Sequence, residues 1–388
     1  MDDKSSPSLK YHKRFRGKLS VIPNVPLDSN QDLLLAYTPG VADVCMEIAK
    51  TGDLAFDYTL KSRVVAIISD GSAVLGLGNI GPLAAIPVME GKAALLYKFS
   101  GIEAFPITLD TKDEDEIIRT IKNIAPVFGA IMLEDIAAPK CVRIERILQK
   151  ELPIPVFHDD QHGTAIVVGA AVTNAFRLLR KDLSQVKAVV CGTGAAGNSV
   201  IRLLKELGVG SISAYNRKGI VSYSKYSAYD FVIKELIDER IIDDPDPDLS
   251  TLSGLIKDKD LFIGVSAPNI LTKEMVESMR PDPVIFALAN PIPEIDPTLA
   301  LAAKAFVVGT GRSDYPNQIN NVLVFPGLMK GLLESRAPSV TTAMKIAACK
   351  ALAYLIEDKN LRPDRIIPGI FEEGVVDAVK NAVISAVK

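Results

Sequence analysis

Two pairs of adjacent acidic residues each follow a short apolar run of the chain. Glu134 and Asp135 come directly after the apolar run 130–133, and Asp159 and Asp160 come at the end of a second apolar run. Carboxylate oxygens gathered from different chain segments are ligands that suit Mg²⁺ or Mn²⁺. An isolated pair of this kind would more often be a solvated strand end, but its recurrence favours a metal site.

The first acidic pair can reach one ion only if the chain turns there. Successive side chains of a β-strand point to opposite faces, so Glu134 and Asp135 can share an ion only where the strand has ended. Pro139, nearby in the sequence, supports such a turn. The sequence therefore predicts a strand that ends just before these carboxylates.

A glycine-rich segment indicates a dinucleotide beside this metal. The sequence GTGAAG at 192–197 follows directly on the apolar run 187–191 and opens a helical pattern. In that context the glycines let a helix N-terminus approach a pyrophosphate. A second match, GLGNIG at 76–81, lies several residues beyond its predicted strand, and we interpret it as a tight loop packed under the active site. Together the motifs predict metal-assisted redox chemistry on a small polar substrate.

The composition argues against several classes of partner. The 388 residues exceed the size at which one core stops growing, so two domains are expected. Lysine and arginine (44) nearly balance aspartate and glutamate (47), which leaves no basic excess for nucleic acid or an anionic membrane. The four cysteines form no CxxC pair, and no apolar stretch has the length needed to cross a bilayer. We therefore expect a cytoplasmic protein with no nucleic-acid or membrane partner.

Alternating predicted strands and helices place the acidic pairs in an α/β domain. The strands are predicted at 64–68 and 130–133, and the helices at 114–124 and 141–149. The long run of apolar and small residues at 163–179 predicts a buried helix that joins two domains. We therefore expect an N-terminal α/β substrate and metal domain at 1–161 and a second domain at 162–388. The basic residues before about position 20 are interpreted as solvated or packed against a partner.

The pattern of the second domain predicts a Rossmann-type, doubly wound parallel sheet. A strand at 186–191, a helix at 198–207 and a strand at 212–215 form one βαβ unit around the glycine segment. Further strands are predicted at 261–265, 284–288 and 306–308, a surface loop at 243–248, and helices at 341–357 and 371–387. We expect the two C-terminal helices to pack back on the first domain.

Seven motifs, in order along nearly the whole chain, resemble the signatures of malic enzymes. They are YTPGV at 37–41, SDG at 69–71 with LGLG at 75–78, EGK at 90–92, LEDI at 133–136, FHDDQHGT at 157–164, ANP at 289–291, and NN at 320–321 with FPG at 325–327. The length and the LGLG motif resemble those of the short prokaryotic branch. The resemblance implies a homodimer that converts (S)-malate and NAD(P)⁺ to pyruvate, CO₂ and NAD(P)H with Mg²⁺ or Mn²⁺.

The resemblance also implies roles for the acidic residues and one lysine. Glu134, Asp135 and Asp160 resemble the ligands of an ion that holds malate through its C2 hydroxyl and the adjacent carboxylate. Lys92 resembles the general base that takes the hydroxyl proton, a role for which its pKa must be lowered. Asp159 is the second candidate for that role.

A tyrosine and three asparagines complete the implied substrate site. Tyr37 resembles the acid that protonates enolpyruvate after CO₂ leaves, and Asn290 with one of Asn320 and Asn321 would bind the substrate carboxylates. Larger malic enzymes carry an arginine near the position of Ala73 that grips a substrate carboxylate. In this chain that charge is expected to come from elsewhere or to be absent.

The implied cofactor site centres on the glycine segment and leaves the choice of NAD or NADP open. It consists of Gly192, Gly194, Ala195, Ala196, Gly197, Asn216, Arg217, Lys218, Ser266 and Asn290. Asn216 stands where an acidic residue would accept a hydrogen bond from the ribose 2′-hydroxyl of NAD. An amide does not repel the 2′-phosphate of NADP, so we expect use of both cofactors with a lean toward NADP. Arg217 and Lys218 could donate to that phosphate, although this basic pair alone decides little.

Two other functions fit parts of the same pattern. A malolactic-type enzyme would keep its nucleotide bound and release lactate, so it would not accumulate reduced cofactor. A nucleotide-sensing protein would retain the fold without the chemistry, but the presence of Tyr37, Lys92 and all four carboxylates speaks against it. The sequence therefore favours an oxidative, decarboxylating malate dehydrogenase.

Overall fold

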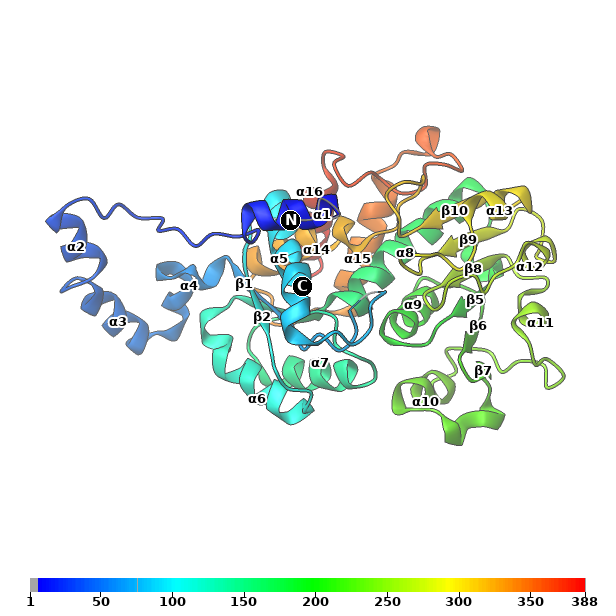
Figure 1. Ribbon diagram of the computed structural model, residues 1–388, viewed down its shortest axis with the longest axis horizontal. Helices are drawn as coiled ribbons and strands as arrows, with labels where there is room; N and C mark the ends of the chain where they lie inside the picture. Colours follow the sequence, from blue (N-terminus) through cyan, green and yellow to red (C-terminus); the bar gives the residue numbers. More distant parts are fainter. Residues whose placement is uncertain (1–5, 75, 388) are drawn as a thin grey trace.

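Two β-sheets organise the computed structural model, which describes residues 6–74 and 76–387 (Figure 1). The first is a parallel four-stranded sheet in the order β2-β1-β3-β4. Its strands are β1 (Val64–Ser69), β2 (Glu103–Thr108), β3 (Ala130–Leu133) and β4 (Val156–His158). The expected N-terminal α/β unit is therefore present, with both acidic pairs at the carboxyl ends of neighbouring strands β3 and β4.

The second sheet has six strands in the order β10-β9-β8-β5-β6-β7. These are β5 (Lys187–Cys191), β6 (Ser211–Asn216), β7 (Gly219–Ile220), β8 (Leu261–Gly264), β9 (Val284–Ala287) and β10 (Val307–Thr310). The strands run parallel except β7, which pairs antiparallel with β6. The predicted Rossmann-type doubly wound sheet is confirmed, and the glycine segment follows β5 at its centre.

Helices cover both faces of the first sheet, which explains why its central strands are continuous apolar runs. Helices α6 (Glu114–Ile124) and α7 (Lys140–Glu151) pack on one face, where Ile68 and Ile131 are buried. Helix α5 (Gly81–Ser100) covers the other face, where Ile67 and Met132 are buried. Alternate residues of β1 and β3 thus enter two different cores.

One hydrophobic core is shared between the two sheets. It contains residues of α5, of α8 (Asp159–Leu178), of α9 (Ala195–Glu206) and of the C-terminal helices α14 (Phe325–Glu334), α15 (Thr342–Tyr354) and α16 (Val375–Ser385). Helix α8 packs against α9 and α15, and α14 packs against α5 and α16. The far face of the second sheet is covered by α11 (Leu252–Ile256), α12 (Lys273–Glu277) and α13 (Pro297–Ala302), while α10 (Phe231–Asp238) packs on α9.

The segment before α16 contacts α5, whereas the helix predicted at 371–387 begins only at Val375. The rings of Phe99 on α5 and Phe371 before α16 lie 5.6 Å apart between centroids. The predicted start of the joining helix was wrong, because α8 begins at Asp159 and not at residue 163. His158 is its N-cap residue, so Asp159 and Asp160 form the first turn instead of preceding the helix.

The N-terminal helices make a different kind of structure from the rest. Helices α1 (Pro7–Phe15), α2 (Asn30–Ala36), α3 (Val41–Lys50) and α4 (Ala55–Tyr58) contain no buried residue. Figure 1 shows α2 and α3 standing away from both sheets at the end of an extended segment. We call residues 19–51 the arm. Leu35 is 68% exposed and Tyr37 is 69% exposed, so its apolar side chains face solvent in the single chain.

No helix in the described part of the chain is both long enough and apolar enough to span a membrane.

Candidate active site

A cavity of about 420 Å³ opens between the carboxyl ends of the two sheets. Its walls include residues from the loops after β1 and β3, from α8, from the segments after β5, β8, β9 and β10, and from the segment before α14. They are Ala73, Gly76, Asp135, Ile136, Ala138, Asp160, Thr164, Val167, Gly194, Ala195, Ala196, Val265, Ser266, Leu288, Ala289, Asn290, Gly311, Ile319, Asn320 and Asn321. Many of the residues predicted for metal, cofactor and substrate therefore meet in one place.

The chain turns sharply after β3, as the sequence required. The Glu134 N–H donates to the Ile68 carbonyl at 2.9 Å and continues the ladder, whereas Asp135 has φ of 54° in the left-handed region. The Asp135 N–H donates to Asp160 Oδ2 at 2.9 Å. The strand end and the first turn of α8 are thus joined directly, and the N-terminus of that helix favours the negative charge of Asp160.

Lys92 on α5 lies among the carboxylates. Its Nζ forms an ion pair with Asp159, lies 3.1 Å from Glu134 Oε1 and stands 4.5 Å from the centre of the Phe325 ring. Burial alone would lower the pKa of Lys92, but the charges of Asp159, Glu134 and Asp160 outweigh burial and raise it. Without a bound cation the pKa of Lys92 is therefore raised, and the lowered pKa that a general base needs stays a prediction.

The carboxylates themselves are under-compensated. Glu134 Oε1 and Asp159 Oδ1 are buried and make no hydrogen bond to a described residue. Burial, and then the neighbouring carboxylates, raise the pKa of Glu134 well above its ordinary value, while Lys92 opposes this shift. Four carboxylates around one ammonium fit an additional cation. As the side chains stand, however, no three His, Cys, Asp or Glu residues within 6–74 and 76–387 are grouped to hold a metal ion.

The glycine segment has the close packing that a dinucleotide fingerprint needs. Gly192 has φ of 105°, and a Cβ on it would lie 2.6 Å from the Val265 carbonyl oxygen. A Cβ on Gly197 would lie 1.8 Å from the Gly192 carbonyl oxygen. Gly194 is the N-cap residue of α9, which begins at Ala195 and not at residue 198 as predicted. The first turn of α9 therefore faces the cavity.

The residues predicted to select the cofactor lie beyond this cavity, at the end of β6. Asn216 Nδ2 donates to Thr193 Oγ1 at 2.9 Å, and the Lys218 N–H donates to Asn216 Oδ1 at 2.8 Å. The Lys218 ammonium turns away and donates to the Ala228 carbonyl. Arg217 is exposed. Asn216 thus ties the turn after β6 to the glycine segment, a contact that the sequence pattern did not indicate.

The three predicted asparagines all line the cavity, but they differ in their own contacts. Asn320 Oδ1 accepts from the Val322 N–H at 3.0 Å and caps the short turn Asn321–Leu323. The Asn321 side chain makes no hydrogen bond to any described residue. Ala73 also lines the cavity, and none of the described lining residues is arginine or lysine. With alanine at position 73, the described wall of the cavity therefore has no cationic side chain from the same chain.

Tyr37 is the predicted catalytic residue that a single chain does not bring to the site. It ends α2 on the arm, while Lys92 lies on α5 within the body of the molecule (Figure 1). Nothing in the sequence spacing could reveal this separation, because it depends on the direction in which the arm leaves the domain.

Sequence reasoning also missed two residues that support the strand ends. Lys140 forms an ion pair with the buried Asp70 after β1, and Ser72 Oγ accepts from the Ala137 N–H at 2.9 Å. These contacts hold the loop after β1 against the turn after β3. The position of Lys140 directly after Pro139, just past the acidic pair, was the available signal.

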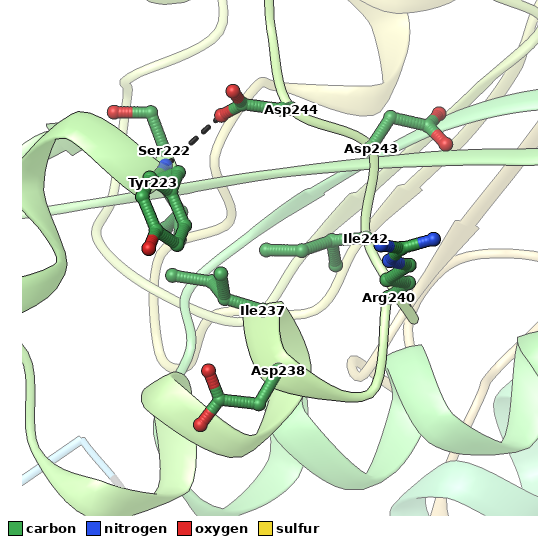
Figure 2. Close-up of a pocket in the computed structure, with 9 residues that line it drawn as sticks. Ser222, Tyr223, Ile237, Asp238, Arg240, Ile242, Asp243 and Asp244 are labelled. Carbon is green, nitrogen blue, oxygen red and sulfur yellow. Dashed lines mark hydrogen bonds between the residues drawn. The ribbon is translucent and has the colours of Figure 1, made fainter.

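A second cavity, of about 520 Å³, lies away from this site (Figure 2). Figure 2 shows Asp238, Asp243 and Asp244 on its rim with Tyr223, whose N–H donates to Asp244 Oδ1 at 2.9 Å. The Asp243 N–H donates to the Ile212 carbonyl at the beginning of β6. Dinucleotides bind at the carboxyl ends of the strands in such a sheet, whereas this cavity lies at the amino end of β6. It is therefore not placed to bind a dinucleotide.

Comparison with known proteins places this architecture in one family. Residues 16–115 match the malic enzyme N-terminal domain, and residues 161–387 match the malic enzyme NAD-binding domain. The chain is 49% identical to the bifunctional malic/malolactic enzyme of Bacillus subtilis, covering 98% of this chain and 92% of that protein. It is 42% identical to an NADP-dependent malic enzyme of Escherichia coli, covering 100% of this chain but only 53% of that protein.

A solved structure agrees with these matches. The crystal structure of an NAD-dependent malic enzyme from Thermotoga maritima superposes with a TM-score of 0.93 at 47% identity, covering 98% of this chain and 99% of the other. Matches of this identity and extent, over both domain types, show that the chain belongs to the malic enzyme family.

Proposed function

We propose that this chain catalyses the oxidative decarboxylation of (S)-malate to pyruvate and CO₂, with reduction of NAD⁺ or NADP⁺. The observation that carries the proposal is the central cavity, where the carboxylate cluster of the first sheet faces the fingerprint helix and the loops after β8 and β9. The names of the relatives support malate as the substrate and a nicotinamide dinucleotide as the oxidant. Hydride leaves C2 of malate for the nicotinamide, and the carboxylate β to the new ketone then leaves as CO₂.

Glu134, Asp135 and Asp160 would hold a divalent cation, Mg²⁺ or Mn²⁺. The buried oxygens without hydrogen bonds and the excess of carboxylates over ammonium groups support this assignment. Such an ion would polarise the C2 hydroxyl and stabilise the enolate formed after decarboxylation. The side chains would need to turn toward a common point, because the ligand set is not yet assembled around one centre.

Lys92 takes the C2 hydroxyl proton in this proposal, and Asp159 holds its ammonium group in place. A cation bound by the neighbouring carboxylates would offset the negative charge that now raises the pKa of Lys92, and this pKa would then fall. The lysine could then lose its proton near neutral pH. The ring of Phe325 limits the directions that the side chain can take, because it lies against Nζ.

We further infer a homodimer in which the arm of one subunit lies over the site of the other. Tyr37 would then protonate C3 of enolpyruvate in the partner's site. The exposure of Leu35 and Tyr37 on the arm supports this assembly, as does the outer face of α5, where Leu83 and Tyr97 are exposed. Exposed apolar side chains gathered on neighbouring parts of a surface are typical of an interface between subunits. We also propose that the boundary between the two domains lies near residue 161. A cytoplasmic location likewise stays a prediction.

One observation supports a second candidate activity. The B. subtilis relative carries both malic and malolactic in its name. A malolactic reaction would yield lactate and CO₂ without net reduction of free cofactor. In this proposal the malic reaction dominates, and both NAD and NADP are accepted with a lean toward NADP.

The direct test is an assay of malate with each cofactor in the presence of Mn²⁺ or of EDTA. We expect reduced cofactor and pyruvate to accumulate in equal amounts, and turnover to stop in EDTA. Lactate without reduced cofactor would support the malolactic reaction instead. Full turnover in EDTA would overturn the metal assignment, and a thermal melt in EDTA would show whether the protein is still folded.

A further inference from the structure

Glu294 is a buried carboxylate that lies beneath the loops lining the central cavity. Its side chain is fully buried, with 0% exposure. Glu294 Oε1 accepts the Ser266 N–H at 2.9 Å, and Glu294 Oε2 accepts the Ala289 N–H at 3.0 Å. Ser266 and Ala289 each stand just past the end of a strand, β8 and β9 respectively. One side chain therefore ties together two neighbouring strand ends.

These two hydrogen bonds fix the direction of two peptide groups. In a trans peptide the N–H and the preceding carbonyl point in opposite directions. Because both N–H groups point at Glu294, the carbonyls of Val265 and Leu288 point away from it. Both of those residues line the central cavity, as do Ser266 and Ala289. The Glu294 carboxylate thus fixes the orientation of these backbone N–H and carbonyl groups in the cavity wall.

The Glu294 carboxyl packs directly against the last residue of β8. A Cβ on Gly264 would lie 2.4 Å from the carboxyl carbon of Glu294, so the last residue of β8 must be glycine for the carboxylate to fit. Burial raises the pKa of Glu294, while the N–H groups of Ala289 and Ser266 oppose that shift. Each carboxylate oxygen accepts from one backbone N–H that would otherwise be buried and unpaired.

The topology of the sheet indicates which half of a dinucleotide this wall would meet. In a doubly wound sheet the two halves of the dinucleotide lie on either side of the switch point. The fingerprint after β5 and the turn after β6 would take the adenosine half. The ends of β8 and β9, which Glu294 joins, lie on the other side and would meet the nicotinamide half.

We propose that Glu294 is a positioning residue for the nicotinamide half of the cofactor, acting through the backbone of Ser266 and Ala289. The inference rests on the proposed function in requiring that the chain binds NAD or NADP. Glu294 itself touches neither cofactor nor malate. Its removal should therefore weaken the binding of the nicotinamide half and leave the binding of the adenosine half unchanged.

The test compares the binding of NADPH with that of ADP-ribose 2′-phosphate, and of NADH with ADP-ribose, by isothermal titration calorimetry. The second ligand of each pair lacks the nicotinamide. In Glu294→Gln we expect the affinity for the reduced cofactor to fall about tenfold, since an amide can accept from only one of the two N–H groups. The affinity for the ADP-ribose ligand should not change. Asp296→Asn is the matched control, because Asp296 is an exposed carboxylate of the same loop.

The outcomes separate this inference from the proposed function. If the wild type binds neither reduced cofactor, the proposed function fails. If the wild type binds and Glu294→Gln weakens both members of a pair equally, or neither, the positioning role of Glu294 is refuted. Hydrogen exchange of the wild type covers the case in which the variant does not fold. We expect the amides of Ser266 and Ala289 to be protected without ligand, and rapid exchange at both would also refute the role.

Discussion

Lys92 is surrounded by more carboxylates than its single positive charge can neutralise. The lysine touches Asp159 and Glu134, and Asp160 lies close enough to contribute to the raised pKa. A residue in this setting is a poor base until another cation shares the carboxylates. The resemblance to malic enzymes predicts Lys92 as the base, and the structure adds the neighbouring carboxylates that raise its pKa.

Replacing Lys92 should slow proton abstraction at the C2 hydroxyl. We expect Lys92→Ala to lower kcat for malate by about 10² to 10⁴-fold, the usual contribution of a general base. Lys98→Ala is the control, since Lys98 is exposed on the same helix. Steady-state rates at saturating Mn²⁺ measure the loss of activity, and a thermal melt shows whether the variant is folded. Near-normal turnover by a folded Lys92→Ala protein would mean that another group is the base.

The choice between cofactors should depend on the charge at residue 216. Asp in place of Asn216 can still accept from the Lys218 N–H, and the Thr193 hydroxyl, which now accepts from the Asn216 amide, can rotate to donate to the carboxylate, so the turn after β6 should keep its shape. A carboxylate there would repel the 2′-phosphate of NADP. We expect the kcat/KM ratio of NADP to NAD to fall by about tenfold or more in Asn216→Asp. An unchanged ratio, or strict use of NAD by the wild type, would refute this assignment.

The elements that carry the site differ in how far the sequence predicted them. Helix α6 was predicted with its observed bounds because its apolar stripe and the Asp113 cap are both visible in the sequence. Strand β2 was missed since it carries Pro106, which an edge strand tolerates. Helix α5, which carries Lys92, was missed because apolar residues occupy its outer face as well as its buried stripe.

The first turn of α8 depends on a charged group from another helix. Glu145 of α7 accepts from the His158 N–H at 2.9 Å and from Gln161 Nε2 and His162 Nε2 at 3.0 Å each. Lys345 of α15 lies 3.1 Å from His162 Nδ1. Helices from both parts of the molecule thus meet at the residues next to Asp159 and Asp160. Spacing could not reveal this contact, because its members are far apart in the sequence.

Glu145 should make the stability of the fold depend on pH. Burial opposes ionisation, but His162, His158 and Lys345 outweigh it and lower the pKa of Glu145. A depressed pKa gives stability that is present above the unfolded value of about 4.3 and is lost as the pH falls through the folded value. We expect Glu145→Gln to lower the free energy of unfolding by about 3 kcal/mol at pH 7, with a gap that closes in acid.

Urea denaturation at several pH values measures this effect. Glu151→Gln is the control, because Glu151 is a half-exposed residue of the same helix, paired with Lys122. Its free energy of unfolding should stay close to that of the wild type. A gap between wild type and Glu145→Gln that persists unchanged below the pKa of Glu145 would show that the ionised carboxylate is not the source of the stability.

At the scale of the whole molecule, the sequence did not predict the arm that carries Tyr37 away from Lys92. The strand ends and the fingerprint were predictable because each depends on residues adjacent in sequence. The distance between Tyr37 and its site depends on how the extended segment before α2 leaves the body (Figure 1). The proposed assembly of two copies would cover the exposed apolar side chains of the arm and of α5, and would bring Tyr37 of one copy to Lys92 of the other.

The most direct test is a heterodimer that combines Lys92→Ala in one chain with Tyr37→Phe in the other, purified by two different affinity tags. If each site takes Lys92 from one chain and Tyr37 from its partner, one site is intact and the other has lost both residues. We expect about half of the wild-type malate oxidation rate from the heterodimer, although each variant homodimer is nearly inactive. A heterodimer no more active than the two homodimers would contradict the shared active site.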